Sequence, residues 1–440
     1  MGGGGTVSLG VAPRLLAIMG SGETSPTMVA THRELFGRLG EQVAAVLLET
    51  PYAFQENKDE ISAKAKRYFD KSVGRRVEVL SDLSADADVM ATEIVLARLR
   101  TARWTFAGPG SPSYALAAWR DTQVPSALAD LLQQGGCAVF ASAAACTIGT
   151  RSLPVYEIYK CGRAPYWLEG LDLIAAVGLR VAVIPHYDNA EGGSHDTRYC
   201  YMGKRRLRQL EDQLADDTAI LGVDEHTAAV FDLDAQILTV RGRGGVTLRR
   251  RGRQWAWPSG ARVALDELRR AAAGRDGDHD WSADPPGEVR SDVGAAVQAV
   301  AEPVALLPQL VDRSVAAFDR ALERRDADGM VAAILDIDRA IVEWSADTLQ
   351  SDDVERAHSM LRSLVVRLGE TAAVGLRDPG EMLAPIVEPL VGLRASLRED
   401  GRYDVADAVR DALLAADVEL RDQPGSTTWH LHDSHHGQQV

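Results

Sequence analysis

The sequence has few cysteines, no long apolar run and no recognisable signal peptide. Its four cysteines include no Cys-x-x-Cys pair, so we expect neither a disulfide framework nor a zinc knuckle, and a reducing, cytoplasmic location fits. No apolar stretch approaches the roughly 20 residues of a membrane-spanning helix, which predicts a soluble chain without a membrane partner. Residues 1–13 are glycine-rich and have no basic segment followed by an apolar one, so we expect a disordered tail. Neither a metal ion nor a cofactor is expected.

Lysine is absent from the second half of the chain, where acidic residues dominate. The formal net charge is −15, and the last lysine is Lys204. From residue 290 onward there are 15 Arg, no Lys and 27 Asp and Glu, and 15 minus 27 gives −12. Such a region repels phosphate backbones, which argues against broad nucleic-acid binding.

Apolar strands alternate with helical segments in the first part of the chain. This alternation predicts an α/β domain over residues 14–273, with a doubly wound, mostly parallel sheet. Ligands of such sheets bind beyond the carboxyl ends of the strands. Residues 274–294 are polar and aperiodic and predict a linker. Helical periodicity without strands predicts an all-α bundle over 295–429, and a His-rich tail follows at 430–440. Predicted strands are 15–19, 43–48, 76–80, 104–107, 137–140 and 181–185. Residues 220–232 predict a strand, a turn at Asp224-Glu225-His226 and a return strand, and 237–240 with 246–249 predict a hairpin.

One stretch, Val139 to Gly149, predicts a sharp turn from a buried strand into a helix. Small residues surround its single early hydroxyl, Ser142, and a strained strand–helix turn needs small neighbours. Such an elbow lifts one side chain above the sheet and directs helical N–H groups at a ligand. A junction that only packs closely would have the same composition. A register one residue later would put Ala143 at the turn and make the protein catalytically silent.

A serine hydroxyl needs a base, an orienting acid and donors for an oxyanion. His186 follows a predicted strand and is the candidate base, although a surface histidine would also fit. Glu157 lies among apolar and aromatic residues and is the candidate acid, because a buried carboxylate requires a partner; Lys160 is the alternative partner. The backbone N–H groups of Gly110 and Ala143 are the candidate oxyanion donors.

Together these motifs resemble the family of serine peptidases that contains cyanophycinase and the aspartyl dipeptidases. The resemblance runs from about Leu15 to Arg251 and includes the glycine-rich loop after the first strand, Gly108-Pro109-Gly110, the elbow, and the stretch from Gly222 to Ala228. It implies a class I glutamine amidotransferase-like fold, with Ser142 as nucleophile, His186 as base and Glu157 as acid. Glu225 is the second candidate for the acid.

The resemblance also implies a substrate site in the polar segment after His186. Arg198 is the candidate partner of a substrate carboxylate, because its planar fork suits a bidentate contact. Pairing of Arg198 with Asp196 or Asp188 is the alternative. The further candidate substrate-binding residues are Tyr187, Asn189 and Glu225.

The C-terminal helices carry a second resemblance. The stretch from Leu393 to Trp429 is similar to the end of bacterial cysteinyl-tRNA synthetases, and the helices before it resemble the same enzymes' helical domain. The nucleotide-binding domain of those enzymes is missing from this sequence, so charging of tRNA is excluded. Self-association or docking through the helical region is expected, and tRNA binding is disfavoured by its charge.

We therefore expect a cytoplasmic serine hydrolase that cleaves an amide bond in a small acidic peptide or amino-acid conjugate through an acyl-enzyme. One alternative is a catalytically silent binding or scaffold protein. Another is a hydrolase or amidase that acts on an aminoacyl-tRNA-derived substrate, which would use both resemblances.

Overall fold

The structure is a computed structural model that describes residues 12–81, 83, 89–192, 195–274, 304–345, 352–374, 379–423 and 426–431. It divides into two compact units, one comprising Met1–Leu307 and Ala340–Val354, the other Pro308–Arg339 and Glu355–Val440. Most of the three tail and linker segments expected at 1–13, 274–294 and 430–440 lies outside the described residues.

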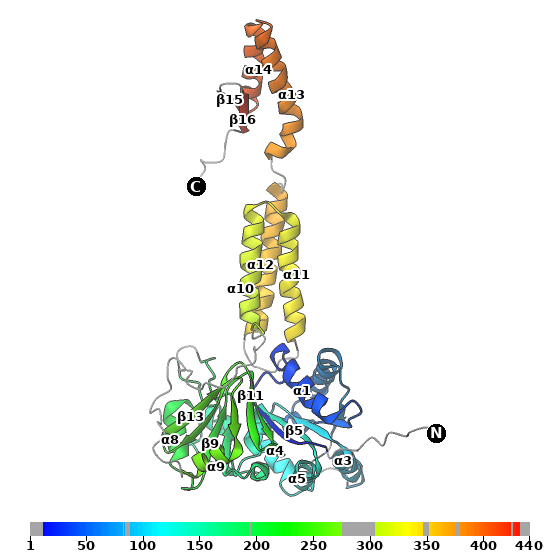
Figure 1. The fold of residues 1–440 in the computed structure, drawn as a ribbon, viewed down its shortest axis with the longest axis vertical. Coiled ribbons are helices and arrows are strands. Elements are labelled where there is room, and N and C mark those ends of the chain that lie inside the picture. Colours follow the sequence, from blue (N-terminus) through cyan, green and yellow to red (C-terminus); the bar gives the residue numbers. More distant parts are fainter. Residues whose placement is uncertain are drawn as a thin grey trace, which may run out of the picture. The chain divides into compact units, whose positions relative to one another are not determined.

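An eight-stranded sheet forms the centre of the first unit (Figure 1), in the order β14-β11-β10-β1-β5-β4-β2-β3. Five neighbouring strands are parallel: β1 (Arg14–Met19), β5 (Gly136–Ala141), β4 (Trp104–Ala107), β2 (Ala45–Leu48) and β3 (Glu78–Leu80). The other end is antiparallel: β10 (Thr227–Asp232), β11 (Ile237–Gly242) and β14 (Arg262–Ala264).

Helices cover both faces of this sheet, and the side chains of β1 show this directly. Leu16 and Ile18 belong to one core cluster, whereas Leu15, Ala17 and Met19 belong to another. Alternate residues of a strand point to opposite faces, so the sheet has a core on each side. The surrounding helices are α1 (Val29–Leu39), α2 (Lys58–Tyr68), α3 (Val89–Thr101), α4 (Pro112–Trp119) and α5 (Val124–Gln134). The predicted α/β class is confirmed.

A second sheet of six strands completes this unit, in the order β13-β12-β9-β8-β6-β7. Strands β6 (Arg151–Ser152), β8 (Val181–Ile184) and β9 (Ala219–Val223) run parallel. Strands β7 (Leu168–Glu169), β12 (Gly245–Arg250) and β13 (Arg253–Pro258) are antiparallel to their neighbours. Helices α8 (Gly203–Glu211) and α9 (Leu265–Ala273) belong to the same unit.

Two sequence predictions about this unit are wrong. The expected hairpin of 237–240 and 246–249 does not form, because β11 pairs with β10 and β14 in one sheet while β12 pairs with β9 and β13 in the other. The glycines between them carry the chain across instead: Gly242 has φ +105°, and a Cβ there would meet the His226 carbonyl oxygen at 2.1 Å. The helical spacing of residues 114–134 predicts a single helix, but the structure divides this stretch into α4 and α5.

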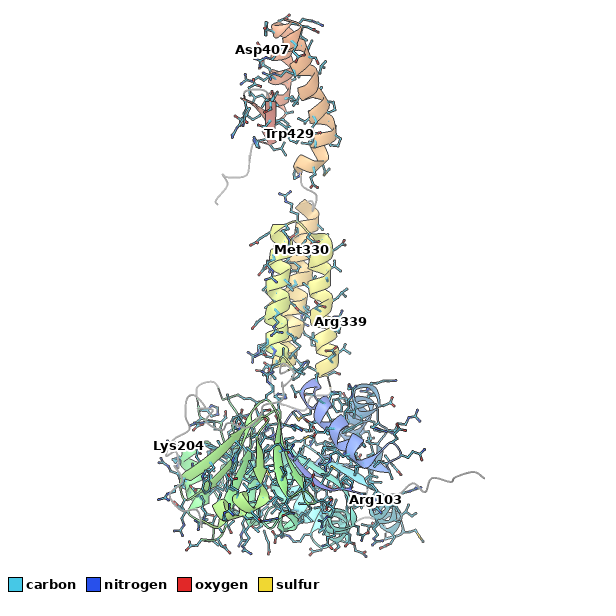
Figure 2. All side chains as sticks on the ribbon, in the orientation of Figure 1. Arg103, Lys204, Met330, Arg339, Asp407 and Trp429 are labelled. Atoms are coloured by element: carbon cyan, nitrogen blue, oxygen red, sulfur yellow. The ribbon has the colours of Figure 1, made fainter. Side chains whose placement is uncertain are left out.

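Five helices lie wholly or mostly in the described part of the second unit: α10 (Leu307–Glu323), α11 (Ala327–Trp344), α12 (Asp353–Val374), α13 (Pro379–Glu399) and α14 (Tyr403–Ala415). Residues 307, 340–344 and 353–354 of these helices belong to the first unit. The second unit is not all-α, since β15 (Val418–Gln423) and β16 (Ser426–Leu431) form an antiparallel hairpin. Val387 of α13 and Leu413 of α14 pack against Val418 and Leu420 of β15. Figure 2 marks Met330 on α11, Asp407 on α14 and Trp429 on β16.

A buried arginine joins α13 to the hairpin of the second unit. Arg394 is 2% exposed, and its two terminal nitrogens donate to both carboxylate oxygens of Asp422 at 2.8 and 2.9 Å. Asp422 also accepts from Thr427 Oγ1 at 2.8 Å. A planar guanidinium suits such a two-point contact, so the pair holds the hairpin against the helix.

No helix among the described residues has the length and apolar character needed to cross a membrane.

Candidate active site

Ser142 lies at the sharp turn between β5 and the short helix α6 (Ser142–Thr147). Its φ is +48°, a left-handed conformation that is strained for a residue with a side chain. The residues around it are small and buried, from Ala143 to Cys146, which lets the backbone turn without collision. Phe140 stays within β5 and is 1% exposed. The turn therefore comes at Ser142 rather than at Ala143.

His186 follows β8 and reaches the serine hydroxyl. Ser142 Oγ and His186 Nε2 are 2.8 Å apart. The backbone of His186 is also left-handed, with φ +48°, and its N–H donates to the Gly20 carbonyl at 3.3 Å. The histidine is thus anchored to the loop after β1, and Ser142 and His186 form one hydrogen-bonded pair.

Glu225 orients His186 from the other side of the ring. Glu225 Oε1 lies 2.9 Å from His186 Nδ1 and accepts a second hydrogen bond from Asn189 Nδ2 at 2.9 Å. Parallel pairing of β8 with β9 explains this contact, because Ile184 faces Gly222 and the residues just beyond each strand therefore meet. Asp188 Oδ1 accepts the Glu225 N–H at 2.7 Å, which fixes the turn.

The acid predicted first, Glu157, is not in this arrangement. It lies on the short helix α7 (Val155–Tyr159), and its buried Oε2 has no hydrogen-bond partner among the described residues. Val155 and Ile158, on either side of it, pack into a core cluster and hold the helix there. The second sequence candidate, Glu225, is the acid that bonds to the histidine.

His186 and Glu225 each shift the pKa of the other towards its charged form. Burial alone would lower the pKa of His186, but the hydrogen bond and negative charge of Glu225 outweigh it and raise the pKa to about 9. Burial alone would raise the pKa of Glu225, yet the contacts with His186 and Asn189 lower it below its ordinary value. The pair thus favours an imidazolium beside a carboxylate, the charge state that forms when histidine takes a proton.

The candidate oxyanion donors lie on segments that are joined to each other. Ala143 is in the first turn of α6, where a backbone N–H has no intrahelical acceptor. Ala144 N–H donates to the Gly108 carbonyl at 3.2 Å, which ties α6 to the loop that carries Gly110. Gly110 has φ +138°, and a Cβ there would lie 1.9 Å from the Pro51 carbonyl oxygen. Only glycine fits this close approach.

Three candidate substrate-binding residues have other partners. Arg198 forms a two-point ion pair with Asp196, at 2.8 and 2.9 Å, which is the alternative that the sequence left open. Tyr187 is 5% exposed and packs edge-on against Tyr199 in the core. Asn189 is fully buried and holds Glu225 in place. None of these three side chains is therefore positioned as expected.

Two aromatic residues near the centre were missed by sequence analysis. The Tyr201 ring is 6.4 Å from the His186 ring, and the Tyr159 ring is 5.0 Å from that of Tyr201. The aromatic pair at 199 and 201 was a visible signal, but the left-handed backbone that positions it could not be read from residue types.

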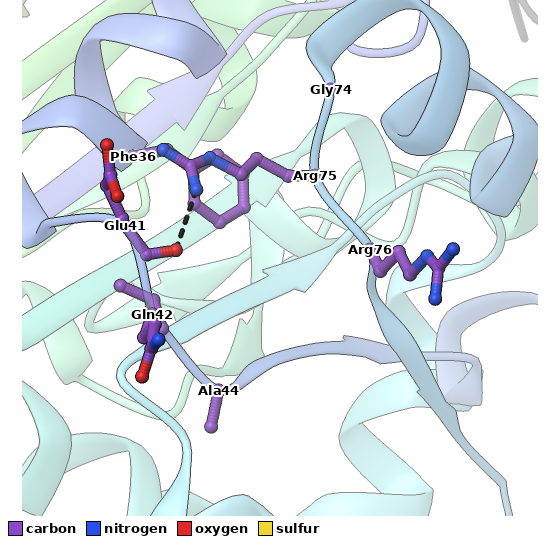
Figure 3. A pocket seen from close by; sticks show the side chains of 8 residues that line it. Phe36, Glu41, Gln42, Ala44, Gly74, Arg75 and Arg76 are labelled. Carbon is purple, nitrogen blue, oxygen red and sulfur yellow. Dashed lines mark hydrogen bonds between the residues drawn. The ribbon is translucent and has the colours of Figure 1, made fainter.

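A separate pocket of about 480 Å³ lies away from this centre. Figure 3 shows Arg75 over the Phe36 ring, with a hydrogen bond to the Glu41 carbonyl at 2.7 Å. The pocket is lined by residues that precede β2 and β3, so it opens at the amino ends of the parallel strands. Ser142 lies at the carboxyl ends, on the opposite edge of the sheet.

Comparisons with known proteins find different relatives for the N-terminal and C-terminal parts of the chain, as the sequence predicted. No protein-family model matches. The C-terminal region is similar to cysteine–tRNA ligases: 30% identity over 99 residues with that of Dehalococcoides mccartyi, covering 22% of this chain and 21% of the ligase. The ligase of Thermosipho africanus is 25% identical over 101 residues, covering 23% and 22%. The chain thus spans about a fifth of the length of these curated relatives.

Over the N-terminal part, the chain is similar to two solved structures that are described as peptidases. A peptidase from an acI-B1 Actinobacterium has a TM-score of 0.48 and 20% identity, over 58% of this chain and 98% of that one. A putative peptidase E protein from Listeria monocytogenes has a TM-score of 0.36 and 16% identity, over 54% and 99%. The chain is therefore similar to peptidases in its first part and to cysteine–tRNA ligases in its last.

Proposed function

We propose that this chain is a serine hydrolase of the peptidase or amidase type, which cleaves an amide bond through an acyl-enzyme. The observation that carries the proposal is the unbroken chain of hydrogen bonds from Ser142 through His186 to Glu225. The left-handed turn at Ser142 adds support, because strained elbows of this kind present nucleophiles in hydrolases.

Each member of the triad has a defined role in this proposal. His186 Nε2 takes the hydroxyl proton while Ser142 Oγ attacks the amide carbonyl carbon, and the N–H groups of Ala143 and Gly110 receive the oxyanion. The imidazolium then gives the proton to the departing amine, leaving an ester on Ser142. Water, deprotonated by the same histidine, attacks that ester and releases the acid. Glu225 keeps Nδ1 protonated and stabilises the imidazolium throughout.

Reaction of the full chain with a fluorophosphonate probe tests this function directly. We expect covalent labelling of Ser142, found by mass spectrometry of the labelled peptide, and no labelling of the Ser142→Ala variant. Labelling at another residue would contradict the assignment of Ser142 as the nucleophile. No labelling at all would favour a silent scaffold protein.

Arg198 was predicted to bind the carboxylate of an acidic substrate, but it forms an ion pair with Asp196 instead. A small peptide or amino-acid conjugate remains the proposed class, on the ground that the proposed chemistry needs only one accessible amide. Similarity of the C-terminal region to cysteine–tRNA ligases supports one second candidate, hydrolysis of an aminoacyl-tRNA-derived substrate. Binding of tRNA separates the two.

A further inference from the structure

The end of α11 contacts the turn that carries the proposed catalytic acid. α11 ends at Trp344, and residues 340–344 belong to the first unit. The Trp344 indole meets the His226 ring edge-on, with 5.6 Å between the ring centroids and 71° between the planes, a favourable arrangement of two rings. His226 directly follows Glu225 in the chain. An aromatic side chain of the helical region therefore packs one residue away from the acid.

The His226 ring also packs against the glycine-rich loop after β1. Its Nδ1 lies 3.0 Å from Thr27 Oγ1 and 3.4 Å from Ser25 Oγ, and a Cβ at Gly22 would lie only 2.1 Å from this nitrogen. His226 is 7% exposed and Trp344 is 4% exposed. The loop and the indole together hold the ring and shield it from water.

The backbone of His226 is strained, and contacts with distant segments fix it. Its φ is +51°, a left-handed value that a residue with a side chain keeps only where its surroundings hold it. The His226 N–H donates to Ser21 Oγ at 3.2 Å, and the His226 carbonyl accepts the Arg243 N–H at 2.9 Å. The Arg243 guanidinium in turn donates to the Val304 carbonyl, shortly before α10. The chain is thus linked to this turn both before α10 and at the end of α11.

The burial of His226 affects the charges around the acid. Burial lowers the pKa of His226 to about 4, against the charge of Glu225, which raises it, while Arg243 and His186 lower it further. His226 is therefore neutral at neutral pH. A neutral ring does not compete with His186 as the cationic partner of the Glu225 carboxylate. Because the indole covers the ring, it helps to keep His226 neutral.

We infer that Trp344 is a positioning residue for the proposed hydrolase: by packing against His226, it holds the turn that presents Glu225 to His186. The inference rests on the proposed function, since the position of Glu225 matters to the rate only if it orients the histidine. The indole Nε1 is buried without a hydrogen-bond partner among the described residues, so Trp344 acts by packing alone. The helical region then supports the triad as well as any docking or self-association.

The rate of covalent labelling of Ser142 by a fluorophosphonate tests this role in the full chain. We expect Trp344→Ala to lower the maximal labelling rate about 10- to 100-fold, because small displacements of a catalytic group cost factors of this order. The probe concentration that gives half the maximal rate should change little. Trp344→Phe should keep most of the rate, since a ring remains and no hydrogen bond is lost. An unchanged maximal rate in Trp344→Ala would overturn the inference.

Two matched variants separate this role from a general effect on the helices. Val342→Ala changes a 65% exposed side chain of the same helix, and Trp429→Ala removes a tryptophan of β16 in the second unit. Both should be labelled as fast as the unaltered protein, and a loss in either as large as that in Trp344→Ala would contradict the assignment. If circular dichroism shows that Trp344→Ala is unfolded, Trp344→Leu takes its place. It leaves a smaller cavity and should also lose labelling rate.

Combination with Glu225→Gln tests whether Trp344 acts through the acid. In the Glu225→Gln protein, Trp344→Ala should reduce the labelling rate no further, because the carboxylate that the indole helps to position is already gone. Effects of independent residues would multiply instead, and that result would refute the proposed route through Glu225.

The protonation of His226 gives a readout that does not depend on activity. An NMR titration of the histidines should show the pKa of His226 rising in Trp344→Ala from about 4 towards 6.5, because water reaches the ring. A pKa that stays at about 4 would show that the indole does not shield His226. Labelling of Ser142 at equal rates in the unaltered protein and in Trp344→Ala would overturn this inference alone. Absence of labelling in the unaltered protein would overturn the hydrolase function, and with it the catalytic role of Trp344.

Discussion

Asn189, a fully buried residue, donates a hydrogen bond from Nδ2 to Oε1 of Glu225 over 2.9 Å. The same oxygen faces His186 Nδ1 at 2.9 Å. One carboxylate oxygen is therefore held from two directions, and the plane of the histidine ring depends on a fully buried side chain. This relationship makes Asn189 a positioning residue in the proposed mechanism.

We expect Asn189→Ala to lower kcat about 10- to 100-fold, because a hydrogen bond to a charged group is worth about 1.5–3 kcal/mol. Without the amide donor the pKa of Glu225 should rise, since this bond helps to lower it. Steady-state kinetics measure the first effect. A merely structural role would change thermal stability and leave the pH profile of kcat unaltered.

Ser142→Ala should lower turnover by at least about 10³-fold, the usual result of removing one triad member. Both residues carry a Cβ, so the left-handed turn is equally strained in each, and the melting temperature should change little. Cys146→Ala is the matched control one helical turn later, and it should retain activity. Full activity in Ser142→Ala would exclude the serine mechanism.

The rate should rise with pH from neutrality towards about 9, the pKa of His186, because only the neutral imidazole can accept the serine proton. Glu225→Gln removes the charge that raises this pKa. The rising limb should therefore move to lower pH while the maximal rate falls. A pH series of kcat/KM measures both.

Glu157→Gln is the control for that series, since Glu157 does not bond to the histidine. Its profile should match that of the unaltered protein. If Glu157→Gln moved the rising limb of the pH–rate profile and Glu225→Gln did not, Glu157 rather than Glu225 would be the acid.

Asp224 predicts a dependence of stability on pH. Burial and the neighbouring Asp188 raise the pKa of Asp224 from 3.8 to about 7, so the folded state retains this proton longer than the unfolded chain. Its contribution to stability is complete below pH about 4 and is lost as the pH rises to about 7. Asp224→Asn should remove the part of the pH-dependent loss of unfolding free energy that Asp224 causes, about 2–4 kcal/mol. Urea unfolding of both proteins at pH 5 and pH 8 compares them, and equal losses would contradict the prediction.

Bulk tRNA should not bind tightly to the full chain at near-physiological ionic strength. The charge of −12 after residue 289, from 15 Arg and 27 Asp and Glu, repels phosphates. Filter binding against a salt series measures this, with a cysteine–tRNA ligase as the positive control. Tight, salt-sensitive binding would support the aminoacyl-tRNA-derived substrate.

The periodicity of apolar residues predicted much of the fold, but it did not predict the contacts between segments that are distant in the sequence. Strands such as Ala45–Leu48 are apolar throughout, and a strand buried on both faces must be. The hairpin at Gly242 was misassigned because two neighbouring strands look alike whether they pair with each other or with different sheets. Ser142 and His186 were found because each follows an apolar run. Glu225 was ranked second because its proximity to His186 comes from the register of β8 and β9, which residue types do not encode.

The proposed triad is distributed over both sheets of the first unit. Ser142 follows β5 of the eight-stranded sheet, His186 follows β8 of the six-stranded sheet, and Glu225 lies between β9 and β10, where the chain passes from one to the other. Neither sheet could be excised as a smaller enzyme, because each would retain only a fragment of the proton relay. A slip of less than an ångström between the sheets would separate hydroxyl from imidazole while leaving every strand intact. Turnover would then be lost before the circular dichroism signal of the secondary structure changed.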